Sequence, residues 1–436
     1  MAGVRRRLAS LGVRPFGRLL SSYTLNELGD SVGVVALAIL VYDRTEDVAA
    51  TAAFFVVGKF LPALVAPALT ARLDQVALRR SLPGIYVVEA LVFAALALVA
   101  DGRFVLALVL LLALVDGTLA VTARGLTRGA VGAVLEPAGR LKEGNALMNI
   151  GFALSSVGGA ALAGLLVSQV GLATALLVDA ASFLVIALII GSARGLPHVD
   201  MTRQPWRERL GEGLRFVRGH RAIRLLLSGQ AIALVLFTLV IPIEVVYAKQ
   251  SLGTTDAGFG ILLASWGAGI VVGSLVYLLV KSRSALALII VSTAGIGAGY
   301  LGMAAADTLL VACAFSALGG TGNGVQWIAV MTALQEATPR EYQARVTGLL
   351  ESLGAGIPGV GYLLGGVLAS IGTPRTAYAV AGGGVLVLVV AAIAASGRMR
   401  ADARAMRGDK GQRARPGDRP LPEALSGAPS FEAPER

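Results

Sequence analysis

The chain is poor in the residue types that build disulfides, metal centres and catalytic clusters. It has 436 residues, with one cysteine, Cys313, and two histidines, His198 and His220. A single cysteine excludes an intramolecular disulfide, and so few histidines make a metal site unexpected. Only 15% of the residues are charged, against about 25% in soluble domains. We therefore expect no metal, no cofactor and no large water-soluble core.

Long apolar runs take the place of the missing charge. Hydrophobic residues make up 56% of the sequence, and windows of about 20 apolar residues, enough to cross hydrocarbon, recur along it. The pattern predicts an all-α membrane protein with twelve transmembrane helices. We place the spans at 17–42, 49–71, 83–100, 104–123, 144–168, 172–193, 222–248, 257–280, 285–305, 308–334, 344–371 and 376–396.

Basic residues set the predicted orientation. With the N-terminus inside, the segments on that side hold 33 lysines and arginines, and the opposite loops hold 4. Cytoplasmic loops carry such an excess, so we predict that both termini are cytoplasmic and that the protein lies in the inner (plasma) membrane. The net charge of +11 then faces anionic membrane lipids, and we expect no nucleic-acid partner.

The spans fall into two groups joined by a polar segment. We expect an N-terminal six-helix half at 1–193, a cytoplasmic linker at 194–221, a C-terminal six-helix half at 222–396 and a disordered cytoplasmic tail at 397–436. The linker sequence RERLGEGLRFVRGH can form an amphipathic helix at the membrane interface. The tail has five prolines and mixed charge, and such a composition buries no core.

A weak internal repeat supports the two halves. Shifted by 202 residues, the segment 145–166 aligns with 347–368, and shifted by 206 residues, the segment 18–22 aligns with 224–228. Both shifts correspond to six spans per half. Two parallel six-helix pseudo-repeats around a central cavity form a transporter architecture, with the substrate site near the midplane between the halves.

Local motifs resemble those of a known superfamily. The stretch TARLDQVALRR follows the second span, where the superfamily has the loop motif G-x-L-A-D-R-x-x-R-R-R. Asp74, Arg79 and Arg80 match the motif, whereas Thr70 and Gln75 depart from it. The runs GKFLPALVAP and GRLKEGNALMNIGFALSSVGGAALAGLL resemble segments of drug and metabolite exporters. The chain therefore resembles the major facilitator superfamily, and within it the macrolide-efflux and enterobactin-exporter group.

This resemblance implies a fold and a role for the loop residues. It implies a monomeric secondary active transporter of a small-molecule substrate rather than an enzyme. It also implies that Asp74, Arg79 and Arg80 form a latch at the cytoplasmic mouth that holds one conformational state. The alternative is that these charges only anchor the helix ends on the positive side of the membrane.

A lysine, Lys59, stands inside the second span. A lone cation there costs about 2.5–3.5 kcal/mol on insertion scales. The first span offers anions, because Glu27 and Asp30 lie on one stripe with Tyr23 and Asn26 at helical spacing. We predict that Lys59 pairs with Glu27 and Asp30. The pair either only fixes one helix to the other or exchanges a proton and so couples charge to conformation.

Other polar residues inside the apolar spans are candidates for a substrate cavity. We expect the proton-coupling and cavity-lining set to be Glu27, Asp30, Lys59, Asp116, Glu351, Asn323, Gln326 and Trp327. Two further acids, Asp179 and Glu244, fall nearer the predicted outer face, where they are either hydrated or functional.

These features together predict a proton-driven exporter or antiporter. It would move a drug, a siderophore or another small metabolite by alternating access, as multidrug-resistance pumps do. A polytopic membrane enzyme or lipid-handling protein and a transporter-like sensor are the alternatives. The predicted outside loops are short, and the chain has no Walker A sequence, so it contains no ATPase of its own.

Overall fold

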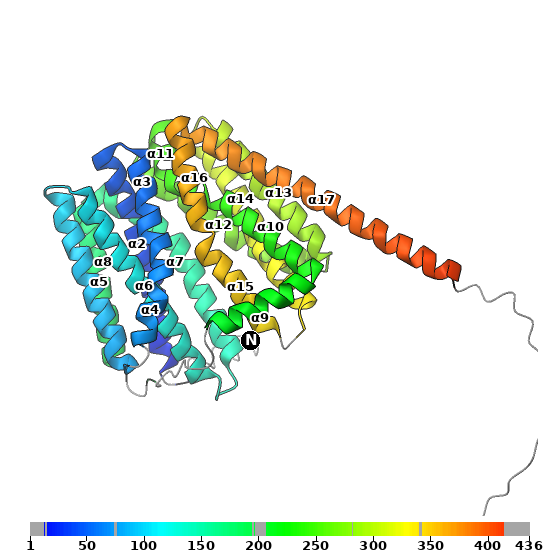
Figure 1. Cartoon of the computed structure of the whole chain (residues 1–436). Helices are drawn as coiled ribbons and strands as arrows, with labels where there is room; N and C mark the ends of the chain where they lie inside the picture. The colour runs from blue at the N-terminus through cyan, green and yellow to red at the C-terminus, as the bar shows by residue number, and fades with distance from the viewer. Residues whose placement is uncertain are drawn as a thin grey trace, which may run out of the picture. The chain divides into compact units, whose positions relative to one another are not determined.

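The computed structural model describes residues 13, 15–73, 76–193, 196, 206–280, 282–339 and 342–413. These residues form helices joined by short turns (Figure 1). Residue contacts divide the chain into two units, Met1–Val390 and Ala391–Arg436. The helices described below belong to the first unit, except for the end of the last one.

The first seven α-helices and one π-helical turn are called the N-terminal helices. In chain order they are α2 (Phe16–Thr45), α3 (Val48–Phe55), η2 (Val56–Phe60), α4 (Leu61–Leu73), α5 (Leu78–Asp101), α6 (Leu106–Leu135), α7 (Leu141–Val170) and α8 (Leu172–Gly191).

The remaining elements are called the C-terminal helices. In chain order they are α9 (Trp206–Gly219), α10 (Arg221–Thr238), η3 (Ile241–Ile243), α11 (Glu244–Val246), η4 (Tyr247–Ser251), α12 (Asp256–Val280), α13 (Ala285–Ala305), α14 (Leu309–Ala337), α15 (Gln343–Gly356), α16 (Pro358–Ile371) and α17 (Pro374–Arg413).

Within the described chain, eleven helical segments are long and apolar enough to cross a membrane. They coincide with eleven of the twelve predicted spans, which confirms an all-helical membrane protein. The remaining predicted span corresponds to α14, which has 29 residues. Its middle, GGTGNGVQ, is rich in glycine and polar groups, and this lowers its hydropathy below that of the other spans.

The second span is continuous but not regular. The backbone N–H of Leu61 bonds to the carbonyl oxygen of Val56, five residues back, so η2 is a π-helical turn between α3 and α4. Pro62 follows at once and has no N–H to donate to the preceding turn. Lys59 therefore lies in a widened turn of the helix.

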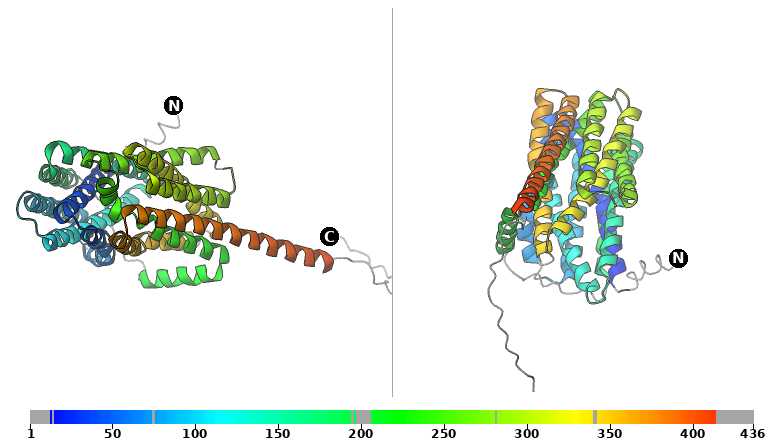
Figure 2. Two further views of the ribbon diagram at one scale, coloured as in Figure 1. Left: turned by 90° about the horizontal axis from the view of Figure 1, so that it is seen from above. Right: turned by 90° about the vertical axis from the view of Figure 1, so that its right-hand side faces the viewer.

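The N-terminal and C-terminal helices lie side by side, drawn from blue to cyan and from green to orange (Figure 2). The two groups meet where α7 packs on α12 and where α3 packs on α16. Small residues make the first contact close, because a Cβ atom on Gly260 would lie only 2.8 Å from the carbonyl oxygen of Ala160. The small residues of the fifth span therefore pack closely on α12.

One correction to a predicted boundary concerns the fourth span. It was predicted to end at 123, but α6 continues to Leu135. Arg124 and Arg128, expected in a cytoplasmic loop, therefore lie inside the helix. Arginine is a good helix former, and a long side chain can carry its charge away from apolar surroundings, so charge alone does not end this helix.

The tail also differs from its prediction. Residues 397–413 were expected to be disordered, but they continue α17, which ends at Arg413. This stretch is rich in alanine, arginine and methionine, which favour helix. The five prolines all follow it, from Pro416 onward, and fall outside the described residues.

The predicted amphipathic helix of the linker is present as α9. It packs against α10 and α15 (Figure 1). Val217 is buried in a small apolar cluster with Ile223, Leu334 and Leu350, whereas Leu214 is exposed. One apolar face of α9 is therefore covered by the protein itself.

Candidate functional site

A polar stripe runs along the face of α2 that looks toward α6. Tyr23, Glu27 and Asp30 follow one another at intervals of four and three residues, which places them on one side of the helix. The side chains of Glu27 and Asp30 are only 4% and 8% exposed. Buried carboxylates need a cation or hydrogen-bond donors beside them.

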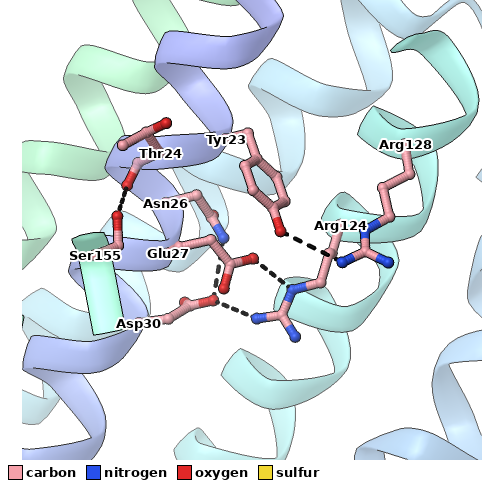
Figure 3. Close-up of polar contacts among 8 residues, drawn as sticks. All are labelled: Tyr23, Thr24, Asn26, Glu27, Asp30, Arg124, Arg128 and Ser155. Atoms are coloured by element: carbon pink, nitrogen blue, oxygen red, sulfur yellow. Dashed lines mark hydrogen bonds and ion pairs between the residues drawn. The ribbon is translucent and has the colours of Figure 1, made fainter. Parts of the chain in front are cut away.

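Arg124 of α6 supplies that cation (Figure 3). Its Nε lies 2.7 Å from Oε1 of Glu27, and its Nη2 lies 3.2 Å from Oδ2 of Asp30. Asn26 donates a further hydrogen bond of 3.1 Å from Nδ2 to the same Asp30 oxygen. The planar guanidinium has several donors at fixed angles, so it can hold two carboxylates at once.

Arg128 lies one turn further along α6. Its Nη2 donates to the hydroxyl of Tyr23 over 3.4 Å (Figure 3). Arg128 is exposed, and Arg124 is 35% exposed. The α2–α6 charge cluster, defined as Tyr23, Asn26, Glu27, Asp30, Arg124 and Arg128, thus places two buried carboxyl groups against one shared guanidinium that remains partly accessible.

The prediction that Lys59 pairs with Glu27 and Asp30 is wrong. Both acids pair with Arg124 instead. Lys59 lies in η2, is half-buried and interacts electrostatically with Asp116 of α6. The error follows from the misplaced end of the fourth span, because ending that helix at 123 removed the true partner from the membrane.

Three more carboxyl groups are buried among the N-terminal helices: Glu89 in α5, Asp116 in α6 and Asp179 in α8. Within the described residues, neither carboxyl oxygen of Glu89 has a hydrogen-bond partner, nor has one oxygen each of Asp116 and Asp179. Asp116 was expected to lie inside its span and does so. Asp179 was placed nearer a hydrated face, but it is 2% exposed.

The position of Asp179 depends on two glycines of α2. A Cβ atom on Gly33 would lie 2.8 Å from Oδ2 of Asp179, and one on Gly29 would collide with its other oxygen. Ser182 donates a hydrogen bond of 3.1 Å to that second oxygen. Because Gly29 and Gly33 have no side chains, the carboxylate of Asp179 fits into the contact between α2 and α8.

The candidate substrate residues of the C-terminal helices differ in their burial. Gln326 of α14 is buried and donates from Nε2 to Oε1 of Gln230 in α10 over 2.7 Å. Trp327 is 38% exposed, and Asn323 is half-buried. Glu351 belongs to α15, but its side chain lies outside the described residues.

A second charged group joins the two sets of helices at the Asp43 end of α2. Lys249 of η4 forms ion pairs with Asp43 and with Asp256 at the start of α12, the latter over 2.7 Å. The side chain of Lys249 is 18% exposed. This bridge ties the end of the first span to the end of the seventh span and the beginning of the eighth.

Comparison with known proteins identifies the family. Residues 8–413 match the transmembrane secretion effector family. The chain belongs to this family of the major facilitator superfamily. No curated protein sequence matches the chain.

Solved structures of transporters share the fold. A point mutant of the nucleoside transporter NupG has a TM-score of 0.69 at 15% identity, covering 87% of this chain and 99% of its own. A POT family transporter in complex with a thioalcohol-conjugated peptide has a TM-score of 0.68 at 12% identity, covering 88% and 96%. A bacterial homologue of the human lysosomal transporter Spinster, inward-facing and unoccupied, has a TM-score of 0.59 at 14% identity, also covering 88% and 96%.

The family match and the fold together make this chain a multi-pass membrane transporter of the major facilitator type. The resemblance to the superfamily is confirmed at that level. Its loop motif is only partly described, because Asp74 lies outside the described residues. Arg79 donates from Nε to the carbonyl oxygen of Gly191 at the end of α8 over 3.3 Å, and Arg80 is exposed.

Three basic residues of these sites, Arg124, Arg128 and Lys249, are absent from the set predicted from the sequence. Arg124 was counted as a loop charge, although Arg124 and Arg128 stand four residues apart, as helical neighbours do. Lys249 was counted as an outside-loop charge. Its partner Asp43 is 206 residues away, so no local signal could have linked the two.

Proposed function

We propose that this transporter is a proton-coupled exporter of a drug, a siderophore or another small metabolite, of the macrolide-efflux and enterobactin-exporter kind. The observation that supports coupling is the α2–α6 charge cluster, in which Glu27 and Asp30 share one guanidinium. Carboxyl groups buried inside a span are the groups that transporters use to carry protons.

The proposed coupling step follows from charge balance. With both carboxylates ionised, Arg124 holds α2 and α6 together through two ion pairs. Protonation of Glu27 or Asp30 removes one negative charge and leaves Arg124 with a single strong contact. The contact between α2 and α6 is then free to rearrange, and the return of the proton restores it. The partly exposed guanidinium gives water a route to the pair.

The proposed architecture completes the twelve-span prediction. It takes α14 as the twelfth span and divides the protein into two six-helix halves at 1–193 and 222–396, joined by a linker at 194–221. Both termini lie on the cytoplasmic side of the inner membrane, where α9 meets lipid headgroups, and the protein works as a monomer. The helix pairing between α7 and α12 and between α3 and α16 supports this division.

The remaining predicted site residues keep proposed roles. Asp116 and Lys59 interact electrostatically, so we place them in the central region beside the charge cluster. Asn323, Trp327 and Glu351 are proposed to contact substrate, whereas Gln326 is engaged by Gln230 and is proposed to position α14. Asp74, Arg79 and Arg80 are proposed as the cytoplasmic latch, with Arg79 holding the end of α8.

Transport driven by an imposed pH gradient tests the proposal. Inside-out vesicles are loaded with a pH-sensitive dye and challenged with a panel of amphipathic compounds. We expect wild-type protein to accumulate a substrate against its gradient, and the double variant Glu27→Gln with Asp30→Asn only to equilibrate it. Glu143→Gln is the matched control, since among the described residues Glu143 forms a single long ion pair of 3.9 Å, with Arg140. Full accumulation by the double variant would end the coupling proposal.

A further inference from the structure

Glu89 is a buried acid that the proposed coupling does not use. It lies at the middle of α5, about 17 Å along the helix from either end. Its side chain is 0% exposed, and neither carboxyl oxygen has a hydrogen-bond partner among the described residues. An ionised carboxylate in apolar surroundings is very costly unless a cation or several donors compensate it.

Aromatic contacts lie on either side of Glu89 along α5. Tyr86 and Phe93, three residues before it and four after it, are on the same side of the helix. The centroids of their rings are 6.4 Å and 5.4 Å from that of Phe183 in α8. Glu89 therefore lies in the contact between α5 and α8, on the face of α5 that is turned away from solvent and lipid.

The charged surroundings of Glu89 are mostly acidic. Five charged or titratable side chains interact with it electrostatically: Asp30, Asp116, Asp179, Arg124 and Tyr86. Arg124 is the one cation of this set, and its guanidinium is already bonded to two carboxylates of α2. An ionised Glu89 would thus have three acids around it and, within the set, no cation free to pair with it.

Helix α2 reaches the same contact through a glycine. A Cβ atom on Gly33 would lie 2.6 Å from Cζ of Phe93 and 2.8 Å from Oδ2 of Asp179. The α2 backbone thus lies against α5 and α8 within one turn of Glu89. Because α2 also carries the two acids of the α2–α6 charge cluster, a shift of α2 at that cluster would change its contact with α5 and α8 as well.

We propose that Glu89 is a second proton-binding site of the transporter, which holds a proton in the present conformation and releases it when α2 moves away from α5 and α8. The proton would pass to water entering the parted contact and leave a carboxylate behind. An apolar side chain would fill this position at a lower cost, and an ionisable residue inside a span is expected to have a function. The inference rests on the proposed coupling, because it uses the movement of α2 assigned there.

Infrared spectra of the purified full-length protein in lipid nanodiscs test the bound proton. A protonated carboxyl group has a carbonyl stretching band that a carboxylate lacks. At neutral pH, the difference spectrum between wild type and Glu89→Gln should contain this band. The difference spectrum for Glu143→Gln, which removes a partly exposed acid paired with Arg140, should contain carboxylate bands instead. Carboxylate bands in the Glu89 difference spectrum would overturn the proposed site.

A second pair of variants tests the control by α2. Gly33→Ala must push α2 away from Phe93 and Asp179, whereas a Cβ atom on Gly17, also in α2, would meet no atom within 4 Å. The Glu89 band, taken against the matching Glu89→Gln variants, should disappear at a lower pH in Gly33→Ala than in wild type. Gly17→Ala should titrate as wild type does. An unchanged titration in Gly33→Ala would overturn the release step. Size exclusion and thermal melting check folding, and Glu89→Leu is the second variant if Glu89→Gln does not fold.

Transport separates this inference from the proposed coupling. With the membrane potential clamped at zero, loss of one of two coupled protons should reduce the limiting accumulation ratio to about its square root. We expect this for Glu89→Gln with any panel compound that the wild type concentrates, and wild-type accumulation would overturn the second proton alone. Full accumulation by the double variant Glu27→Gln with Asp30→Asn would overturn the proposed coupling and leave the infrared result for Glu89 standing.

Discussion

In α2, α5, α6 and α8, five carboxyl groups are buried, and two of them, those of Glu27 and Asp30, pair with the guanidinium of Arg124. In α12, α13 and α14, glycines bring helix backbones into contact instead. A Cβ atom on Gly322 would lie 2.5 Å from the carbonyl oxygen of Ser292, and one on Gly299 would lie 2.7 Å from the Cα of Gly319. The buried charges are thus concentrated in the N-terminal helices, whereas close backbone packing joins α12, α13 and α14.

The two kinds of contact respond to different events. An ion pair between buried groups changes when a proton binds, because the pair loses one of its charges. A glycine contact has no titratable group and changes only if the helices separate. The proposed proton-responsive step therefore belongs to the N-terminal helices. This difference leaves α12, α13 and α14 of the C-terminal helices as a frame held by close backbone packing.

The largest effect is expected where the charge contact is broken. Arg124→Gln leaves Glu27 and Asp30 buried without their cation. Breaking a buried pair costs about 3–5 kcal/mol, and the 35% exposure of Arg124 places the expected cost at or below the lower end. We expect a lower melting temperature and a loss of uphill transport of about tenfold or more, measured in proteoliposomes with a pH gradient.

Two further variants sharpen that result. Arg140→Gln removes an arginine from a long surface pair and should change neither property. Glu244→Gln should not lower the melting temperature, since no cation is left unpaired in the C-terminal helices. A melting temperature for Arg124→Gln equal to that of Arg140→Gln would mean that the charge cluster does not hold α2 to α6.

The next effect tests the glycine frame. A Cβ atom on Gly320 would collide with the carbonyl oxygen of Trp266 in α12, so Gly320→Ala must push α14 away from α12. Overpacking of this kind costs about 1–3 kcal/mol. Gly383→Ala is the matched control, because a Cβ atom there would meet no atom within 4 Å. Thermal melting in detergent should separate the two, and equal melting temperatures would contradict a rigid frame.

The frame was easier to foresee from sequence than the charge cluster. Runs of about 20 apolar residues are local signals, and they correctly indicated eleven of the twelve predicted spans. Arg124, the partner of Glu27 and Asp30, follows 18 residues of α6 that are apolar or small apart from Asp116. A charge in that position is typical of the end of a span, so the sequence predicts a loop there. Hydropathy cannot show that such an arginine faces a carboxyl pair on another helix.

The ion bridge between Asp43 and Lys249 could not be predicted from the sequence either, because the two residues are 206 positions apart and no local pattern relates distant helix ends.

A moderate effect is expected at the bridge between the two sets of helices. Lys249→Gln removes both ion pairs with Asp43 and Asp256. Partly exposed pairs contribute about 0–1 kcal/mol each, so the protein should fold normally. We expect the balance of conformations to shift by about twofold to fivefold, read from the distance between spin labels at Asp47→Cys and Gly253→Cys.

A double variant makes this prediction decisive. If Lys249 acts through Asp43, then adding Asp43→Asn to Lys249→Gln should produce little further change in the label distances. Additive shifts of the two single variants would mean that the residues act independently. The bridge would then hold no connection between the N-terminal and C-terminal helices.

The smallest effect is expected at Arg79, and it separates a latch from an anchor. Arg79 donates to the last turn of α8 through the Gly191 carbonyl oxygen over 3.3 Å, where a cation also meets the negative end of the helix dipole. Because Arg79 is exposed, its loss should lower stability by no more than about 1 kcal/mol.

Transport rates separate the two roles. If Arg79 only anchors α8, the Arg79→Lys variant should transport at almost the wild-type rate, since a lysine can serve the same helix end. If it forms a latch with Asp74, Arg79→Gln should reduce the transport rate as Asp74→Asn does, and combining the two should reduce it no further. If the two substitutions instead reduce the transport rate independently of each other, Arg79 and Asp74 do not form a latch. Arg79 would then be an anchor within the N-terminal helices, with no part in the change between conformations.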